Sequence, residues 1–117
     1  MTREDFLSLC LEEYGVTPDY PWIKDPETAV LRHGNNKKWF ALVMDIPMSK
    51  LGLNSDKVST VVNMKYSEDM LTAFGHPKGV FPAYHMNKVH WVSVLLDMAD
   101  DSTVSLILDE SFNLTKK

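Results

Sequence analysis

The chain has 117 residues, of which 44% are hydrophobic and 24% charged, and its formal net charge at pH 7 is −4. This composition is typical of globular proteins and excludes collagen-like, low-complexity and disordered chains. A single cysteine allows no intrachain disulfide and no apolar run is long enough for a membrane span or signal peptide, so we expect one cytoplasmic domain over residues 1–117.

The first predicted element is a helix over residues 3–14. Thr2 and Asp5 have the spacing of a capping box, and apolar side chains recur behind them at every fourth position. Gly15 stands where a left-handed residue ends many helices. We therefore expect this helix to begin and end within these bounds.

An irregular segment is predicted over residues 16–28, because three prolines interrupt regular structure there. Its tyrosine and tryptophan are expected to fold back on the core. Residues 29–33 and 38–45 are predicted as the two strands of a hairpin, since both are rich in apolar residues. The glycine and two asparagines at 34–36 are turn residues that tolerate positive φ.

A short excursion over residues 47–52 leads to the clearest alternation in the chain, at residues 57–65. Apolar residues dominate every second position of this segment, which predicts a half-buried strand. Ser67 then serves as the N-cap of a short helix that ends before Gly75. Acidic residues in its first turn suit the positive end of the helix dipole.

The last third begins with residues 76–82, whose composition is that of a loop. Residues 83–86 are predicted to be extended, and Asn87 and Lys88 to turn. Residues 90–97 have the apolar run of a strand.

A final helix is predicted with Asp101 or Ser102 as its N-cap, since apolar residues follow at helical spacing. The order of elements is then helix, two or three strands, helix, one or two strands, helix. Short connections in this order predict an α+β fold, in which an antiparallel β-sheet packs against helices on one face.

Charge is unevenly distributed along the chain. Residues 1–31 carry two basic and seven acidic side chains (−5), residues 32–90 carry eight and four (+4), and residues 91–117 carry two and five (−3). A basic middle can build one positive face on an acidic protein, and it can equally consist of scattered, solvated lysines.

No catalytic or cofactor motif is present. Cys10 lies on the apolar face of the first predicted helix, so we assign it to the core. The four histidines lack the spacing of a metal motif, and the five glycines form no phosphate-binding loop. We expect no cofactor and no metal, and no enzymatic activity is predicted.

The densest polar chemistry lies in residues 84–91, YHMNKVHW, which combine two imidazoles, an amide, an ammonium and two aromatic rings. Such a cluster can bind a phosphate, hydrogen-bond a base edge or stack a ring. It is equally compatible with a turn in which Asn87 bonds local backbone and Trp91 begins a core strand.

These residues, together with PWIKDP, AVLRHGNNKKWFAL and VNMK, resemble the MmcQ/YjbR family of small bacterial proteins over nearly the whole chain. The most specific part is residues 84–91, which match the family's YHMNKxHW signature. Asp109, Ser111 and Leu114 resemble its D-x-S-Y-x-L end. Phe112 replaces the usual tyrosine there, so we expect that position to serve packing alone.

The resemblance implies a two-layer sandwich similar to the CyaY/frataxin-like architecture and to the double-wing DNA-binding domain of a phage transcription factor. The family is commonly labelled DNA-binding on that likeness. The first hypothesis is therefore a cytoplasmic nucleic-acid-binding module with double-stranded DNA as partner. The alternative is a protein-interaction or regulatory module with an unidentified protein partner and no nucleic-acid activity. No membrane partner is expected.

A third hypothesis is a small-ligand or enzymatic role, in which His85 and His90 act as acid or base while Lys88 and Asn87 hold an anion. The candidate nucleic-acid-binding or anion-binding residues are Arg32, Lys37, Lys38, Lys65, Tyr84, His85, Asn87, Lys88, His90 and Trp91.

Overall fold

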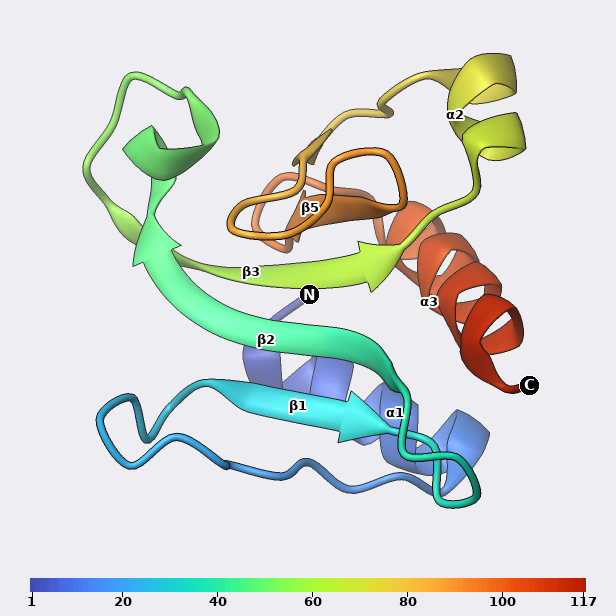
Figure 1. Cartoon of the computed structure of the whole chain (residues 1–117). Coiled ribbons are helices and arrows are strands. Elements are labelled where there is room, and N and C mark those ends of the chain that lie inside the picture. The colour runs from blue at the N-terminus through green and yellow to red at the C-terminus, as the bar shows by residue number, and fades with distance from the viewer.

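The computed structural model describes the backbone of all 117 residues and every side chain except that of Phe74. Its elements are α1 (Arg3–Tyr14), β1 (Ala29–Arg32), β2 (Trp39–Pro47), the 3-10 turn η1 (Met48–Leu51), β3 (Val58–Lys65), α2 (Glu68–Phe74), β4 (Val80–Pro82), β5 (Trp91–Leu95) and α3 (Asp101–Thr115). The five strands form one antiparallel sheet in the order β1-β2-β3-β5-β4, and α1 and α3 cover one of its faces (Figure 1). The predicted α+β fold is therefore confirmed.

The first helix begins and ends where its sequence predicts. The Thr2 hydroxyl accepts a hydrogen bond from the Asp5 N–H at 3.1 Å, and the Asp5 carboxylate accepts one from the Thr2 N–H at 2.9 Å. Gly15 follows with a left-handed φ of 67°. These caps satisfy backbone groups that a helix end otherwise leaves unpaired.

The sheet face beneath α1 and α3, which we call the helix face, carries the larger core. Alternate residues of the central strands, among them Val43, Val62 and Val94, are buried there against α1 and α3. Cys10 belongs to this cluster and is fully buried, as expected. Burial raises the pKa of its thiol to about 12, so the group stays protonated near neutral pH.

Phe112 has the packing role expected of it. Its ring stacks on that of Tyr14 with the centroids 4.0 Å apart, and it meets the Phe40 ring edge-on at 5.1 Å. The imidazole of His33 completes the group at 4.4 Å from the Phe112 ring. This aromatic cluster joins α1, α3 and the first hairpin.

The opposite side of the sheet, which we call the loop face, is covered by loops. Val61 and Leu95 form a second buried cluster there with residues of η1 and of the segment between β4 and β5. In Figure 1 this segment lies in front of the sheet, on the side away from α1 and α3. The prediction that β3 is half-buried is wrong, since Ser59, Val61 and Asn63 on its second face are all buried.

Three other local predictions are wrong. Residues 80–82, assigned to a loop, form β4, whose three residues are too few to show an alternating pattern. Residues 83–86, predicted to be extended, turn back over the sheet because β4 and β5 pair antiparallel. Asp101 and Ser102 lie inside α3, and Asp100 occupies the N-cap position without a side-chain bond.

The aromatic residues of segment 16–28 do not fold back on the core. Asp19 pairs with Val30 at the outer edge of β1, so the segment follows that edge and leaves Tyr20 51% and Trp22 37% exposed. The Trp22 ring meets Trp39 edge-on, with the centroids 5.7 Å apart. Trp22 therefore packs against Trp39 at the start of β2 and not in the core.

Candidate functional site

The turn between β1 and β2 presents two of the predicted cations. Lys37 adopts a left-handed φ of 62°, whereas residues 34–36, which tolerate positive φ, do not adopt it. The Asn36 side-chain oxygen accepts a hydrogen bond from the Lys38 N–H at 2.9 Å, which closes the turn. Lys37 and Lys38 are both exposed.

The C-terminal end of α3 docks on the same turn. Asn36 donates a hydrogen bond to the Thr115 carbonyl at 3.0 Å, and the Lys38 ammonium donates to the Lys117 carbonyl at 2.5 Å. These contacts bring Lys116 and Lys117 beside Lys37 and Lys38. We call these four residues the lysine end.

A buried histidine lies beside the lysine end. His33 is 5% exposed and shares a 2.8 Å hydrogen bond with the Thr115 hydroxyl. Burial lowers the pKa of His33, and the charges of Lys116 and Lys38 lower it further, against an opposing contribution from the Phe112 backbone. Lys38 of the β1–β2 turn and Lys116 after α3 therefore both lie near the His33 imidazole.

Arg32 and Lys65 flank this cluster but differ from it. The Arg32 guanidinium already pairs with the Asp19 carboxylate at 2.8 Å. The antiparallel register of β2 and β3 brings Lys65 beside the start of β2. The Ser111 hydroxyl bridges the two strands there, since it donates to the Phe40 carbonyl and accepts from the Lys65 N–H. Lys65 also lines a shallow hollow together with Glu68 and Asp69 of the first turn of α2.

The signature segment 84–91 divides into an anchored part and a turn. The Tyr84 N–H donates to the Ser93 hydroxyl and the Tyr84 carbonyl accepts from the Asn63 side chain, both at 2.8 Å. Ser93 donates in turn to the Asn63 oxygen at 2.5 Å. This buried network fastens the segment to β3 and β5.

His85 and Asn87 follow Tyr84 with different roles. His85 has a left-handed φ of 59° and its ring lies 3.9 Å from that of Tyr84. The Asn87 side chain accepts from the Val89 N–H at 2.8 Å, and its carbonyl accepts from the Trp91 N–H at 2.9 Å. Asn87 thus makes the local turn that was one of its two expected roles, while Lys88 and His90 beside it are exposed.

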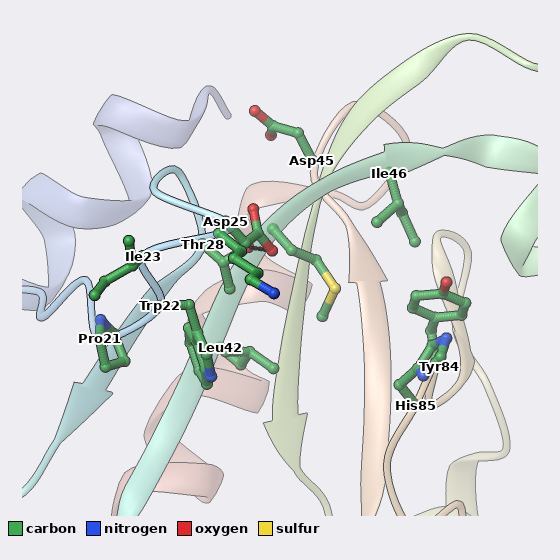
Figure 2. Close-up of a pocket in the computed structure, with 12 residues that line it drawn as sticks. Pro21, Trp22, Ile23, Asp25, Thr28, Leu42, Asp45, Ile46, Tyr84 and His85 are labelled. Atoms are coloured by element: carbon green, nitrogen blue, oxygen red, sulfur yellow. Dashed lines mark hydrogen bonds between the residues drawn. The ribbon is translucent and has the colours of Figure 1, made fainter.

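A groove of about 760 Å³ opens on the loop face, and Tyr84 and His85 form one of its walls (Figure 2). Leu42, Met44 and Ile46 line it from alternate positions of β2. The segment 21–28 forms the opposite wall. Sequence patterns did not reveal this groove, because its two walls lie about sixty residues apart along the chain.

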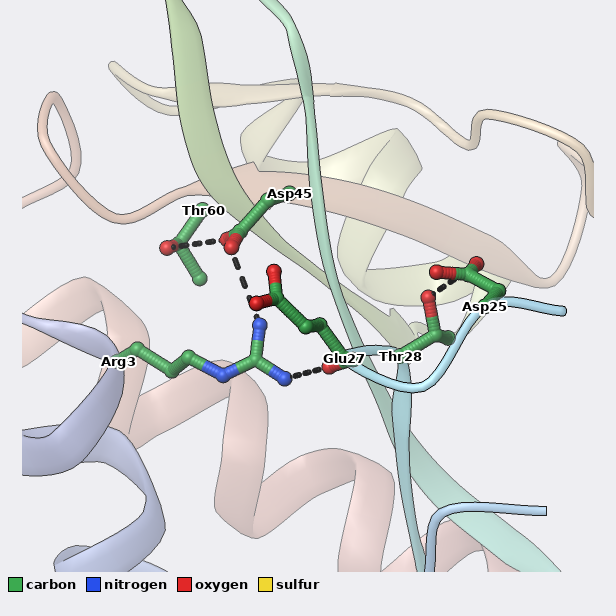
Figure 3. A network of polar contacts seen from close by, with 6 residues as sticks. All are labelled: Arg3, Asp25, Glu27, Thr28, Asp45 and Thr60. Atoms are coloured by element: carbon green, nitrogen blue, oxygen red, sulfur yellow. Dashed lines mark hydrogen bonds and ion pairs between the residues drawn. The ribbon is translucent and has the colours of Figure 1, made fainter. Parts of the chain in front are cut away.

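A polar network holds the wall at 21–28 in place (Figure 3). The Arg3 guanidinium hydrogen-bonds the Glu27 carbonyl and lies 3.4 Å from the Asp45 carboxylate. The Thr60 hydroxyl donates to the same carboxylate at 2.7 Å, and the Thr28 hydroxyl donates to Asp25 at 2.5 Å. Arg3 therefore links α1, β2 and this segment, a role that no motif in the sequence indicated.

In the described part of the chain, no helix combines the length and apolar character needed to cross a membrane.

Comparison with known proteins identifies relatives over nearly the whole length. The family model described as YjbR matches residues 11–114. The uncharacterized protein YyaQ of Bacillus subtilis is 38% identical in an alignment of 117 positions, which covers 99% of this chain and 99% of YyaQ. A crystal structure of a Pseudomonas syringae protein has 40% identity and a TM-score of 0.92, covering 98% of this chain and 99% of its own. A crystal structure of a Deinococcus radiodurans protein has 25% identity and a TM-score of 0.69, with 99% and 79% covered.

Proposed function

This chain belongs to the YjbR family, and we propose that it is a cytoplasmic nucleic-acid-binding module that holds the phosphate backbone of duplex DNA at its lysine end. The observation that carries the proposal is the docking of the α3 terminus on the β1–β2 turn, which gathers four exposed lysines. The expected likeness to a double-wing DNA-binding domain supports the same function.

Phosphate contacts explain how a protein with a net charge of −4 can bind a polyanion. Binding depends on the local potential where the phosphates lie, and salt screens the charges that lie farther than about 10 Å from them. Each lysine that pairs with a phosphate releases condensed counterions from the DNA. Contacts of this kind position a protein on the duplex without selecting a base sequence.

The salt dependence of binding measures the number of such contacts. Four lysine–phosphate pairs predict a slope of log K against log salt of about −3.6, so affinity falls roughly 100-fold between 50 and 200 mM salt. The expected dissociation constant at low salt lies in the non-specific range of roughly 10⁻⁴ to 10⁻⁶ M. Loss of two of the four lysines should halve the slope.

The test is fluorescence anisotropy of a labelled DNA duplex titrated with the protein at several salt concentrations. The variant Lys37→Ala/Lys116→Ala removes two charges whose side chains make no hydrogen bond within the described structure. Its matched control is Lys50→Ala/Lys78→Ala, which removes the same charge from exposed positions. Lys50 and Lys78 lie near the last residues of β2 and β5, at the end of the sheet away from the lysine end. The proposal requires the first variant to bind more weakly than the control.

Two results would contradict it. Equal weakening by both variants would mean that net charge alone governs binding. No binding at 50 mM salt would remove the nucleic-acid assignment and favour the alternative, a protein-interaction module.

A further inference from the structure

We propose that the groove on the loop face is a binding site for a small planar aromatic molecule that carries one anionic group. The site uses none of the residues of the lysine end, so it is independent of the proposed DNA-binding function. Its volume of about 760 Å³ lies in the range of small-molecule pockets in proteins.

The shape and lining of the groove favour a flat apolar body. Leu42, Met44 and Ile46 supply an apolar surface along β2, and Trp22 and Tyr84 stand at either side of it (Figure 2). Trp22 keeps 37% of its surface exposed although it meets Trp39, so part of its ring is free to contact a ligand. Aromatic rings pack favourably on one another in stacked and edge-to-face arrangements.

Free hydrogen-bond donors at the groove can hold one anionic group. Two carboxylates border it, and this chain already supplies a donor to each: Thr28 bonds Asp25, while Arg3 and Thr60 engage Asp45. Lys24 and His85 border it as well, and neither makes a hydrogen bond or ion pair with any described residue. Asp25 and Asp45 are set against Lys24 and the neighbouring Arg3, so the lining is close to neutral, and Lys24 and His85 are the donors that remain to hold an anionic group.

The walls are held before any ligand arrives. Arg3 of α1 donates a hydrogen bond to the Glu27 carbonyl. The Tyr84 N–H and carbonyl are both hydrogen-bonded, to Ser93 and Asn63 respectively. His85 takes a left-handed backbone conformation that is uncommon for residues other than glycine. That conformation places its ring beside Tyr84 at the groove (Figure 2). A preformed wall reduces the entropy lost when a ligand binds.

The experiment uses two fluorescent probes of similar shape and different charge. One is the anion 8-anilino-1-naphthalenesulfonate and the other is its neutral relative N-phenyl-1-naphthylamine. We expect saturable binding of one anion per chain, with the neutral probe binding more weakly. Indole-3-acetate should displace the anionic probe more effectively than the isosteric neutral indole-3-acetamide.

Three variants locate the site. Trp22→Ala should weaken both probes, by roughly tenfold for loss of one aromatic wall. Lys24→Ala should weaken the anion by roughly two- to fivefold and leave the neutral probe unchanged. The control is Leu106→Ala, which removes an apolar side chain that is 58% exposed on α3, and it should change neither affinity. Trp22 and Lys24 are exposed, so these variants are expected to keep the native circular dichroism spectrum.

Several outcomes would overturn the proposal. Binding that never saturates, or that weakens as much in Leu106→Ala as in Trp22→Ala, would show a non-specific apolar surface. Equal displacement by the acid and its amide, together with an unchanged anion affinity in Lys24→Ala, would remove the anionic group from the ligand class.

Discussion

Replacement of Asn63 by alanine tests whether the signature segment depends on the sheet beneath it. Asn63 is fully buried on β3, where its amide donates to the Tyr84 carbonyl and its oxygen accepts from the Ser93 hydroxyl. The substitution removes both hydrogen bonds and leaves the carbonyl in a partly buried place where water reaches it poorly. The loop that carries Tyr84 and His85 should lose its main attachment.

The expected cost follows from the number of bonds lost. Two hydrogen bonds contribute about 1 kcal/mol each, and the carbonyl left without a donor adds about 1 kcal/mol, so we expect a destabilisation of about 3 kcal/mol. For a domain of this size that loss lowers the melting temperature by about 10 °C. Asn54→Ala, at an exposed position, should change stability by less than about 0.5 kcal/mol.

Urea unfolding of the two variants measures this difference. Amide hydrogen exchange in residues 84–91 of Asn63→Ala should also become faster, and amides that exchange only by global unfolding should lose protection by the same free energy that urea unfolding measures. A destabilisation below about 1 kcal/mol would mean that the network contributes no more than one ordinary hydrogen bond and does not hold the signature segment on the sheet.

Three further predictions concern single residues. Burial lowers the folded-state pKa of His33 from 6.5, so the neutral imidazole stabilises the fold. Stability is full above pH 6.5 and falls below it as the unfolded chain binds the proton. Urea unfolding across pH should show a smaller fall in His33→Gln. Gly79→Ala should destabilise the fold by about 3 kcal/mol, because its Cβ would lie 2.5 Å from the Ala99 nitrogen and its backbone has a φ of 82°. The control Gly34→Ala meets no neighbour and should cost less than about 1 kcal/mol in the same assay. The buried Cys10 thiol, with its pKa near 12, should react with a thiol reagent at pH 8 only after denaturation; rapid reaction of the native protein would contradict its burial.

Local residue patterns predicted the elements whose boundaries depend on near neighbours along the chain. The capping box at Thr2 and the left-handed Gly15 bound α1 correctly, because both ends depend on contacts within four residues. The alternation in residues 57–65 located β3 for the same reason. The short strand β4 escaped prediction, since only its pairing with β5 makes three residues a strand.

The candidate sites depend on tertiary structure to different degrees. The basic character of Lys37 and Lys38 and the polar density of residues 84–91 were visible in the sequence. Their surroundings were not: Lys38 and Lys117 are 79 positions apart, and no periodic pattern connects them. Likewise, only the fold showed that Arg32 is paired with Asp19 and that Asn87 closes a turn.

The physical reason lies in the range of the interactions. Caps, turns and alternation arise from neighbours along the chain, so residue order alone records them. The groove and the lysine end arise where the packing of α3 on the sheet and the pairing of β1 with segment 16–28 bring distant residues together. Burial of the two cores sets how these segments pack and therefore which side chains meet in the groove and at the lysine end. No periodic pattern in the sequence records these pairings.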